Sequence, residues 1–229
     1  MIEPRKWKHG WADAYAYRNG AIAEEFLELV VRPSMTALEQ KHLELLSADD
    51  IALSGFAATD HRDLINKTKM AFCLSIQSLW EQQIRRYLIA CVKTLSMEGV
   101  SVAKLEKEPW GKDFNRLFFR VREVHLNDFT SYKMLSLLHL LGNACRHGDG
   151  PSCRDLFASH PYLWPDWMSH EASIQLLQIP SELLASFVDA IVLFWMDMEI
   201  LGLESFANED ARVVARIAHL RNSRESRIT

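Results

Sequence analysis

Glycine and proline are sparse in this sequence of 229 residues, and they cluster between long stretches with apolar residues at helical spacing. The chain holds only nine glycines and seven prolines. Because both residues interrupt regular structure, a chain with so few of them favours long helices. The sequence therefore predicts an all-α fold.

The strongest helical pattern runs from Asp60 to Leu95, and Thr59 or Asp60 is its expected N-cap. Pro33 predicts a start, kink or break within another helical stretch, 21–46. A looser connector, 96–113, is expected to hold one short helix. Further helices are predicted at 114–124, 129–146, 182–201 and 210–224. Between them we expect a long aromatic loop at 151–170 and a short extended segment at 173–179.

The charge balance limits how the chain can meet nucleic acid. Its formal net charge is −4, so any binding of nucleic acid must rest on a local patch of cations. The N-terminal sequence does not resemble a secretory signal. The most apolar segment, 183–203, contains Asp189, Asp197 and Glu199, which are costly in lipid. We therefore expect no membrane span and a cytoplasmic protein.

Neither the cysteines nor the histidines predict a metal centre or a cofactor. The four cysteines form no CxxC pair, so we expect reduced thiols in the core: Cys73, Cys91, Cys145 and Cys153. One close set of ligand-type residues exists, namely His139, His147 and Asp149. However, His139 and His147 stand two helical turns apart, too distant to share one ion without a third element.

A polar cluster lies where the helix 129–146 is expected to end. Asn143, Arg146 and His147 precede a Gly-Asp-Gly turn at 148–150. His139, Asn143 and His147 share one helical face, and Arg146 lies beside them. A cation, an amide and an imidazole at one place could bind or cleave a phosphodiester. Alternatively, the cations cap the helix end, where the dipole favours them, and Gly148 is the C′ residue.

Two stretches resemble the HEPN superfamily, small α-helical domains found in bacterial toxins, antiphage systems and RNA-cleaving effectors. They are SLWEQQIRRY at 78–87 and GNACRHG at 142–148, within a region of similarity that spans 60–150. The family signature is an arginine, usually followed by asparagine or another polar residue, then three variable residues and a histidine, often with glycine next. Asn143, His147 and Gly148 match it, whereas Gly142 occupies the arginine position and Arg146 is the nearest arginine.

The resemblance implies an up-and-down helical bundle and a homodimer in which two motifs form a metal-independent ribonuclease site. It predicts three segments: an N-terminal helical extension (1–58), a HEPN-like core (59–205) and a C-terminal basic helix (206–229). The implied roles are acid/base for His147, phosphate ligand for Arg146 and orienting group for Asn143.

Two further residues bear on this site. Glu81 either orients Arg146 or His147 from a neighbouring helix, or pairs with Arg85 at i,i+4 spacing. Gly142 removes the side chain that the family uses, and it would also permit close helix packing, including packing across a dimer.

Two other features are candidates for contact with RNA or protein. The last helix carries arginines that form either a phosphate-binding patch or a solvated face: Arg212, Arg216, Arg221, Arg224 and Arg227. The aromatic loop around Trp164 and Trp167 either plugs a core edge, or exposes rings that stack on bases or anchor a partner.

Two functions therefore remain open at this point. The first is a metal-independent endoribonuclease of a bacterial defence or toxin system, with RNA as substrate and an antitoxin or defence component as a possible protein partner. The second is a catalytically inactive HEPN-fold module that binds or dimerises and engages a partner protein or a nucleotide.

Overall fold

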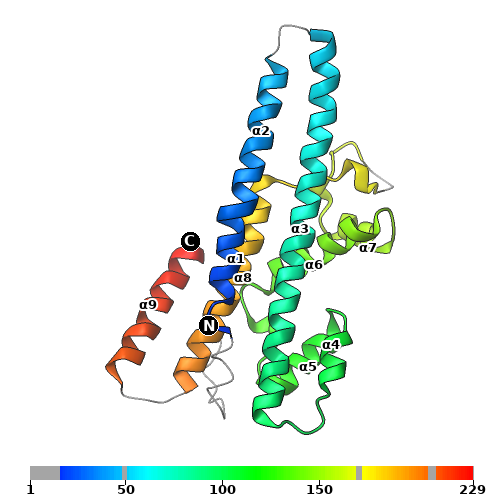
Figure 1. The fold of residues 1–229 in the computed structure, drawn as a ribbon. Coiled ribbons are helices and arrows are strands. Elements are labelled where there is room, and N and C mark those ends of the chain that lie inside the picture. The colour runs from blue at the N-terminus through cyan, green and yellow to red at the C-terminus, as the bar shows by residue number, and fades with distance from the viewer. Residues whose placement is uncertain (1–15, 48–50, 169–171, 206–209, 229) are drawn as a thin grey trace. The chain divides into compact units, whose positions relative to one another are not determined.

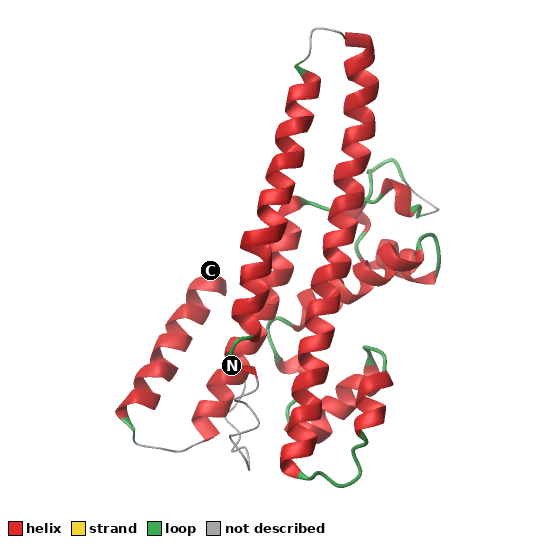
Figure 2. Cartoon of the chain, viewed as in Figure 1, coloured by secondary structure: helices red, strands yellow, loops and turns green. Residues whose placement is uncertain are grey.

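The computed structural model describes residues 16–47, 51–168, 172–205 and 210–228, with the backbone alone for residues 51–53 (Figure 1). Every regular element in these ranges is helical, and none of the described residues forms a strand (Figure 2). The prediction of an all-α helical bundle is confirmed.

The described ranges contain α-helices from the first to the last. They are α1 (Asn19–Phe26), α2 (Arg32–Leu46), α3 (Ile51–Leu95), α4 (Val102–Lys107), α5 (Lys112–Arg122), α6 (Tyr132–His147), α7 (Pro151–Ser159), α8 (Ser181–Ser205) and α9 (Ala211–Ile228). A π-helical turn, Leu27–Val31, joins α1 to α2, and Pro33 lies in the first turn of α2. Proline lacks a backbone N–H, which the first turn of a helix tolerates. Where the sequence predicted a start, kink or break, the structure has a change of helical pitch.

The predicted start of α3 at Thr59 or Asp60 is wrong, because the helix begins at Ile51. Thr59 lies inside the helix and its hydroxyl donates to the Gly55 carbonyl oxygen at 3.0 Å. A threonine can satisfy its hydroxyl in this way in mid-helix, so its presence does not require a helix start. Gly55 is exposed and the helix runs through it.

Two predictions between α6 and α8 are also wrong. The expected loop at 151–170 begins with the helix α7, in which Pro151 occupies the first turn and Cys153 and Leu156 are buried. Pro161–Leu163 forms a 3-10 turn, so only part of this range is irregular. The expected extended segment contains a 3-10 turn, Ile174–Leu176, where Ser173 Oγ accepts a hydrogen bond from the Gln175 amide.

The residues divide into two compact units, to which α3, α6 and α8 each contribute. The first unit comprises Met1–Ala23, Leu79–Leu135 and Asp189–Thr229. An aromatic cluster forms its core: the Trp80 ring lies 4.7 Å from that of Phe194 and 5.9 Å from that of Trp195. Gln83, also buried, accepts a hydrogen bond from Trp195 Nε1 at 2.9 Å and donates to the Asn19 carbonyl.

The helix α9 belongs to the first unit and is joined to α8 by a row of ion pairs. Leu220 is its one buried residue in the described range. The ion pairs between the two helices are Arg216–Glu199, Arg221–Glu204, Arg224–Asp197 and Arg227–Asp189. They account for four of the five carboxylates of α8, all except Glu182. Among the described residues, no helix combines the length and apolarity needed to cross a membrane.

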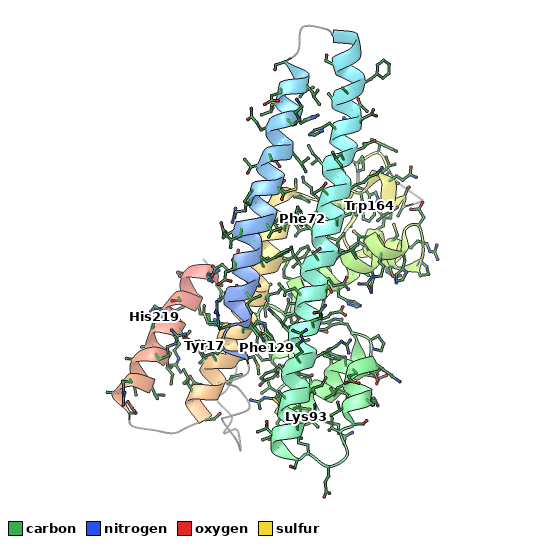
Figure 3. The ribbon with its side chains drawn as sticks, in the orientation of Figure 1. Tyr17, Phe72, Lys93, Phe129, Trp164 and His219 are labelled. Atoms are coloured by element: carbon green, nitrogen blue, oxygen red, sulfur yellow. The ribbon has the colours of Figure 1, made fainter. Side chains whose placement is uncertain are left out.

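The second unit comprises Glu24–Ser78 and Ser136–Val188. Here α2 and the first half of α3 form a hairpin (Figure 3). Phe72 of α3 meets Phe26, the last residue of α1, edge to face with ring centroids 6.5 Å apart. Further along the hairpin, His61 Nε2 donates to the Leu38 carbonyl at 2.9 Å. Most of α6, from Ser136 onward, all of α7 and the first turns of α8 complete this unit.

The pair Arg224–Asp197 yields a prediction about stability and pH. Burial raises the pKa of Asp197, and the hydrogen bond and charge of Arg224 oppose that rise. Arg224→Met removes this opposing effect, so the pKa of Asp197 in the folded protein rises further. The folded protein then keeps a proton on Asp197 at pH values where the unfolded chain, with a carboxyl pKa of ~3.9, has lost it. The protonated Asp197 therefore stabilises the folded variant most at acid pH, and this contribution is lost as the pH rises to the pKa of Asp197 in the folded protein. We expect a loss of about 3 kcal/mol in unfolding free energy at neutral pH, smaller at about pH 5.

Urea unfolding at both pH values measures this difference. Arg216→Met is the matched control, because its pair with Glu199 is more exposed and should contribute at most about 1 kcal/mol. Asp197→Asn in the Arg224→Met background should remove most of the pH dependence. Equal losses at both pH values, or equal losses in the two arginine variants, would contradict this account.

Candidate functional site

The polar cluster lies at the end of α6, as predicted. Leu138, Leu141 and Ala144 are fully buried along one face of this helix. Gly148 ends the helix with a left-handed φ of 69°, and its amide donates to the Ala144 carbonyl at 2.9 Å. Its prediction as the C′ residue is confirmed.

The side chain of Asn143 forms hydrogen bonds within the protein. Its Nδ2 lies 2.9 Å from His139 Nε2, so these two members of the predicted column do meet. Its Oδ1 accepts a hydrogen bond of 3.4 Å from Gln77 Nε2, which also lies 3.3 Å from His139 Nδ1. The amide of Asn143 therefore belongs to a network between α6 and α3.

Gln77 is the residue that sequence reasoning missed. It is fully buried on α3, one position before the stretch that resembles the HEPN family. The available signal was the pair Gln77-Ser78 between the apolar residues Ile76 and Leu79 of a predicted helix. Because a buried amide requires partners, such a position points to a polar contact with a neighbouring helix.

Gly142 is required by this network. A Cβ atom at Gly142 would lie 2.0 Å from Gln77 Oε1 and 2.7 Å from Gln77 Cδ. The predicted role in close helix packing is thus observed within the chain, between α6 and α3. An arginine here would have to displace a buried amide that is held by His139 and Asn143.

Arg146 and His147 have a different environment from Asn143. Both are exposed in the last turn of α6. Within the described part of the chain, neither side chain forms an ion pair or a hydrogen bond. Adjacent in the sequence and open to solvent, they are available to an anionic ligand.

The remaining groups around the cluster are already engaged. Asp149 Oδ1 accepts from the Ile174 amide at 2.5 Å, and its Oδ2 from Ser173 Oγ at 3.4 Å. Across the described ranges, no group of three His, Cys, Asp or Glu side chains could hold a metal ion.

The cysteines have the environment expected of core thiols. All four are free; Cys73, Cys91 and Cys153 are buried and Cys145 is half-buried. Burial raises the pKa of Cys145 to about 12, with a smaller contribution from Cys153. Because the nucleophile is the thiolate, Cys145 is inert at neutral pH although it lies inside the motif.

Glu81 lies half-buried on α3, in the first unit, whereas Arg146 and His147 belong to the second. Its predicted role as an orienting carboxylate therefore stays a prediction. Arg85, its alternative partner, donates to the Leu105 carbonyl at 2.7 Å and lies over the Phe114 ring.

The predicted phosphate-binding arginines of α9 are paired with carboxylates of the chain itself. Arg216 and Arg221 contact Glu199 and Glu204 of α8. Arg212 Nε lies 3.5 Å from Asp210 Oδ1, and the Arg212 side chain is highly exposed. A phosphate would have to compete with these carboxylates for each arginine.

Comparison with protein-family models, curated proteins and solved structures finds no match for this chain.

The contact between Gly142 and Gln77 predicts an unusual response to a glycine-to-alanine substitution. In a helix interior, alanine is normally favoured over glycine by about 0.5–1 kcal/mol. Gly142→Ala should instead lower the unfolding free energy by about 1–3 kcal/mol, because the buried amide must move. Gly55→Ala in α3 is the matched control: its Cβ would meet nothing within 4 Å, so it should stabilise.

Urea unfolding of both variants measures these changes. In a Gln77→Ala background, which is itself less stable, the added Gly142→Ala should cause no further loss. If Gly142→Ala stabilises as Gly55→Ala does, the steric account is wrong.

Proposed function

We propose that this chain is a catalytically inactive HEPN-like module that binds RNA at the end of α6. The observation that carries the proposal is the contact between Gln77 and Gly142. It fills the place where the resembled family has its arginine, and the same network holds the amide of Asn143. Two of the four motif positions thereby serve packing.

The exposed side chains Arg146 and His147 support the binding part of the proposal. A guanidinium offers a fixed fork of N–H donors that suits phosphate oxygens, and an imidazole ring offers a further N–H donor. With a net charge of −4, the chain has no general attraction for nucleic acid, so a local pair of this kind must provide it. A homodimer, as in the resembled family, would place two such pairs in one assembly.

A metal-independent endoribonuclease is the second candidate, and the solvent exposure of His147 next to Arg146 favours it. In that reaction, His147 would remove the proton of the ribose 2′-hydroxyl, whose oxygen then attacks phosphorus. Arg146 would stabilise the charge on the phosphorane, and the leaving 5′ oxygen would take up a proton from water, while His147 returns the proton it gained to solvent. Asn143 contributes to neither step in the observed network.

Incubation of the purified protein with total RNA in EDTA separates the two candidates. We expect the RNA to stay intact when it is incubated with the wild-type protein. In a gel-shift assay, the bound RNA should be retained at a slower-migrating position. Arg146→Ala should weaken retention of all sequences alike and lower the slope of log K against log salt by roughly 0.7–1, because one phosphate contact is lost.

The matched controls are Arg86→Ala and His219→Ala, which remove exposed side chains of the same type from α3 and α9. EDTA-resistant cleavage that disappears in His147→Ala would overturn the inactive assignment in favour of the ribonuclease. Cleavage that persists in His147→Ala, or retention that is unchanged in both Arg146→Ala and His147→Ala, would exclude this end of α6 as the site.

A further inference from the structure

The segment that follows α7 is held firmly to the second unit. Leu163 and Trp164 are buried, and the Trp164 ring meets Phe157 edge to face at 5.3 Å (Figure 3). Trp164 Nε1 donates to the Ser173 carbonyl at 2.8 Å, and the Leu163 carbonyl accepts from the Gln178 amide at 2.7 Å. These residues plug a core edge, as one of the two predictions for this segment required.

Two other aromatic rings of the same segment face solvent. The exposed fraction is 63% for Tyr162 and 72% for Trp167. Trp167 lies in a turn closed by the Met168 amide, which donates to the Pro165 carbonyl at 2.9 Å. Tyr162 lies beside the His160 ring, with centroids 5.9 Å apart. Because their backbone is already fixed, these rings would lose little entropy on binding a flat ligand.

Asp149 ties this aromatic segment to the end of α6. Its carboxylate accepts hydrogen bonds from the Ile174 amide and from Ser173 Oγ, just beyond the exposed rings in sequence. Asp149 itself lies two residues after His147. The exposed rings and the exposed side chains of Arg146 and His147 thus belong to one unit, on either side of α7 in the chain (Figure 1).

We propose that Tyr162 and Trp167 form a stacking platform for the unpaired bases of a single-stranded RNA whose phosphates contact Arg146 and His147. Stacking requires free base faces, which a duplex does not offer, and it tolerates any sequence. Exposed Asp166 beside Trp167 repels phosphate, which directs bases to the platform and the RNA backbone to α6. The platform deepens the RNA-binding function proposed above and rests on it.

Fluorescence anisotropy with a labelled single-stranded RNA of about 12 nucleotides tests the platform, with the same sequence as a duplex for comparison. We expect the single strand to bind more tightly than the duplex. Trp167→Ala should weaken that binding about tenfold or more, and Trp167→Phe should keep most of it. Tyr17→Ala is the matched control, because Tyr17 is a similarly exposed aromatic in the first unit, and it should bind as wild type does.

The variants also separate the platform from the function on which it rests. Unchanged binding in the double variant Tyr162→Ala/Trp167→Ala overturns the platform, and the proposed function survives if Arg146→Ala still weakens binding. Binding that needs Trp167 but neither Arg146 nor His147 overturns the assigned phosphate site and keeps the stacking. Equal affinity for duplex and single strand overturns the platform, and no binding by the wild-type protein overturns both. Circular dichroism of each variant verifies the fold.

Discussion

The close approach of α6 to α3 at Gly142 is the constraint on which the second unit depends. The buried amide of Gln77 touches the backbone of α6 there and holds Asn143 and His139 on the same face. This contact fixes the rotation of α6 about its own axis, and that rotation leaves Arg146 and His147 in solvent. One glutamine thus decides which polar side chains of the motif serve packing and which are offered to a ligand.

The Gly-Asp-Gly turn after α6 joins the proposed RNA site to the segment that follows α7. Gly148 ends the helix in a left-handed conformation that favours glycine, and Asp149 then receives hydrogen bonds from the aromatic segment. The turn therefore both ends α6 and, through Asp149, holds Ser173 and Ile174. In the resembled family this stretch is known for its histidine; in this chain its glycine and aspartate organise the surroundings.

Helical spacing and sparse glycine predicted the fold class and most helices, because apolar periodicity reports directly on buried faces. The start of α3 was missed because Thr59 satisfies its hydroxyl within the helix. α7 was missed because an initial proline and nearby aromatics resemble a loop. The polar cluster was found by its residue types, whereas Gln77 lies 65 positions before Gly142 in the sequence and only tertiary packing brings them together. For the same reason, sequence alone could not pair the arginines of α9 with α8.

The attachment of α9 has a consequence for how the first unit opens. Its hold on α8 rests on ion pairs and a single buried leucine, whereas the aromatic cluster around Trp80 rests on apolar contact. At about 1 M salt the screening length falls to roughly 3 Å, so the exposed pairs Arg216–Glu199 and Arg221–Glu204 weaken, whereas the buried pair Arg224–Asp197 and the aromatic cluster are much less affected. The C-terminal helix should therefore exchange its amide hydrogens as a separate, salt-sensitive unit, well before the rest of the bundle unfolds.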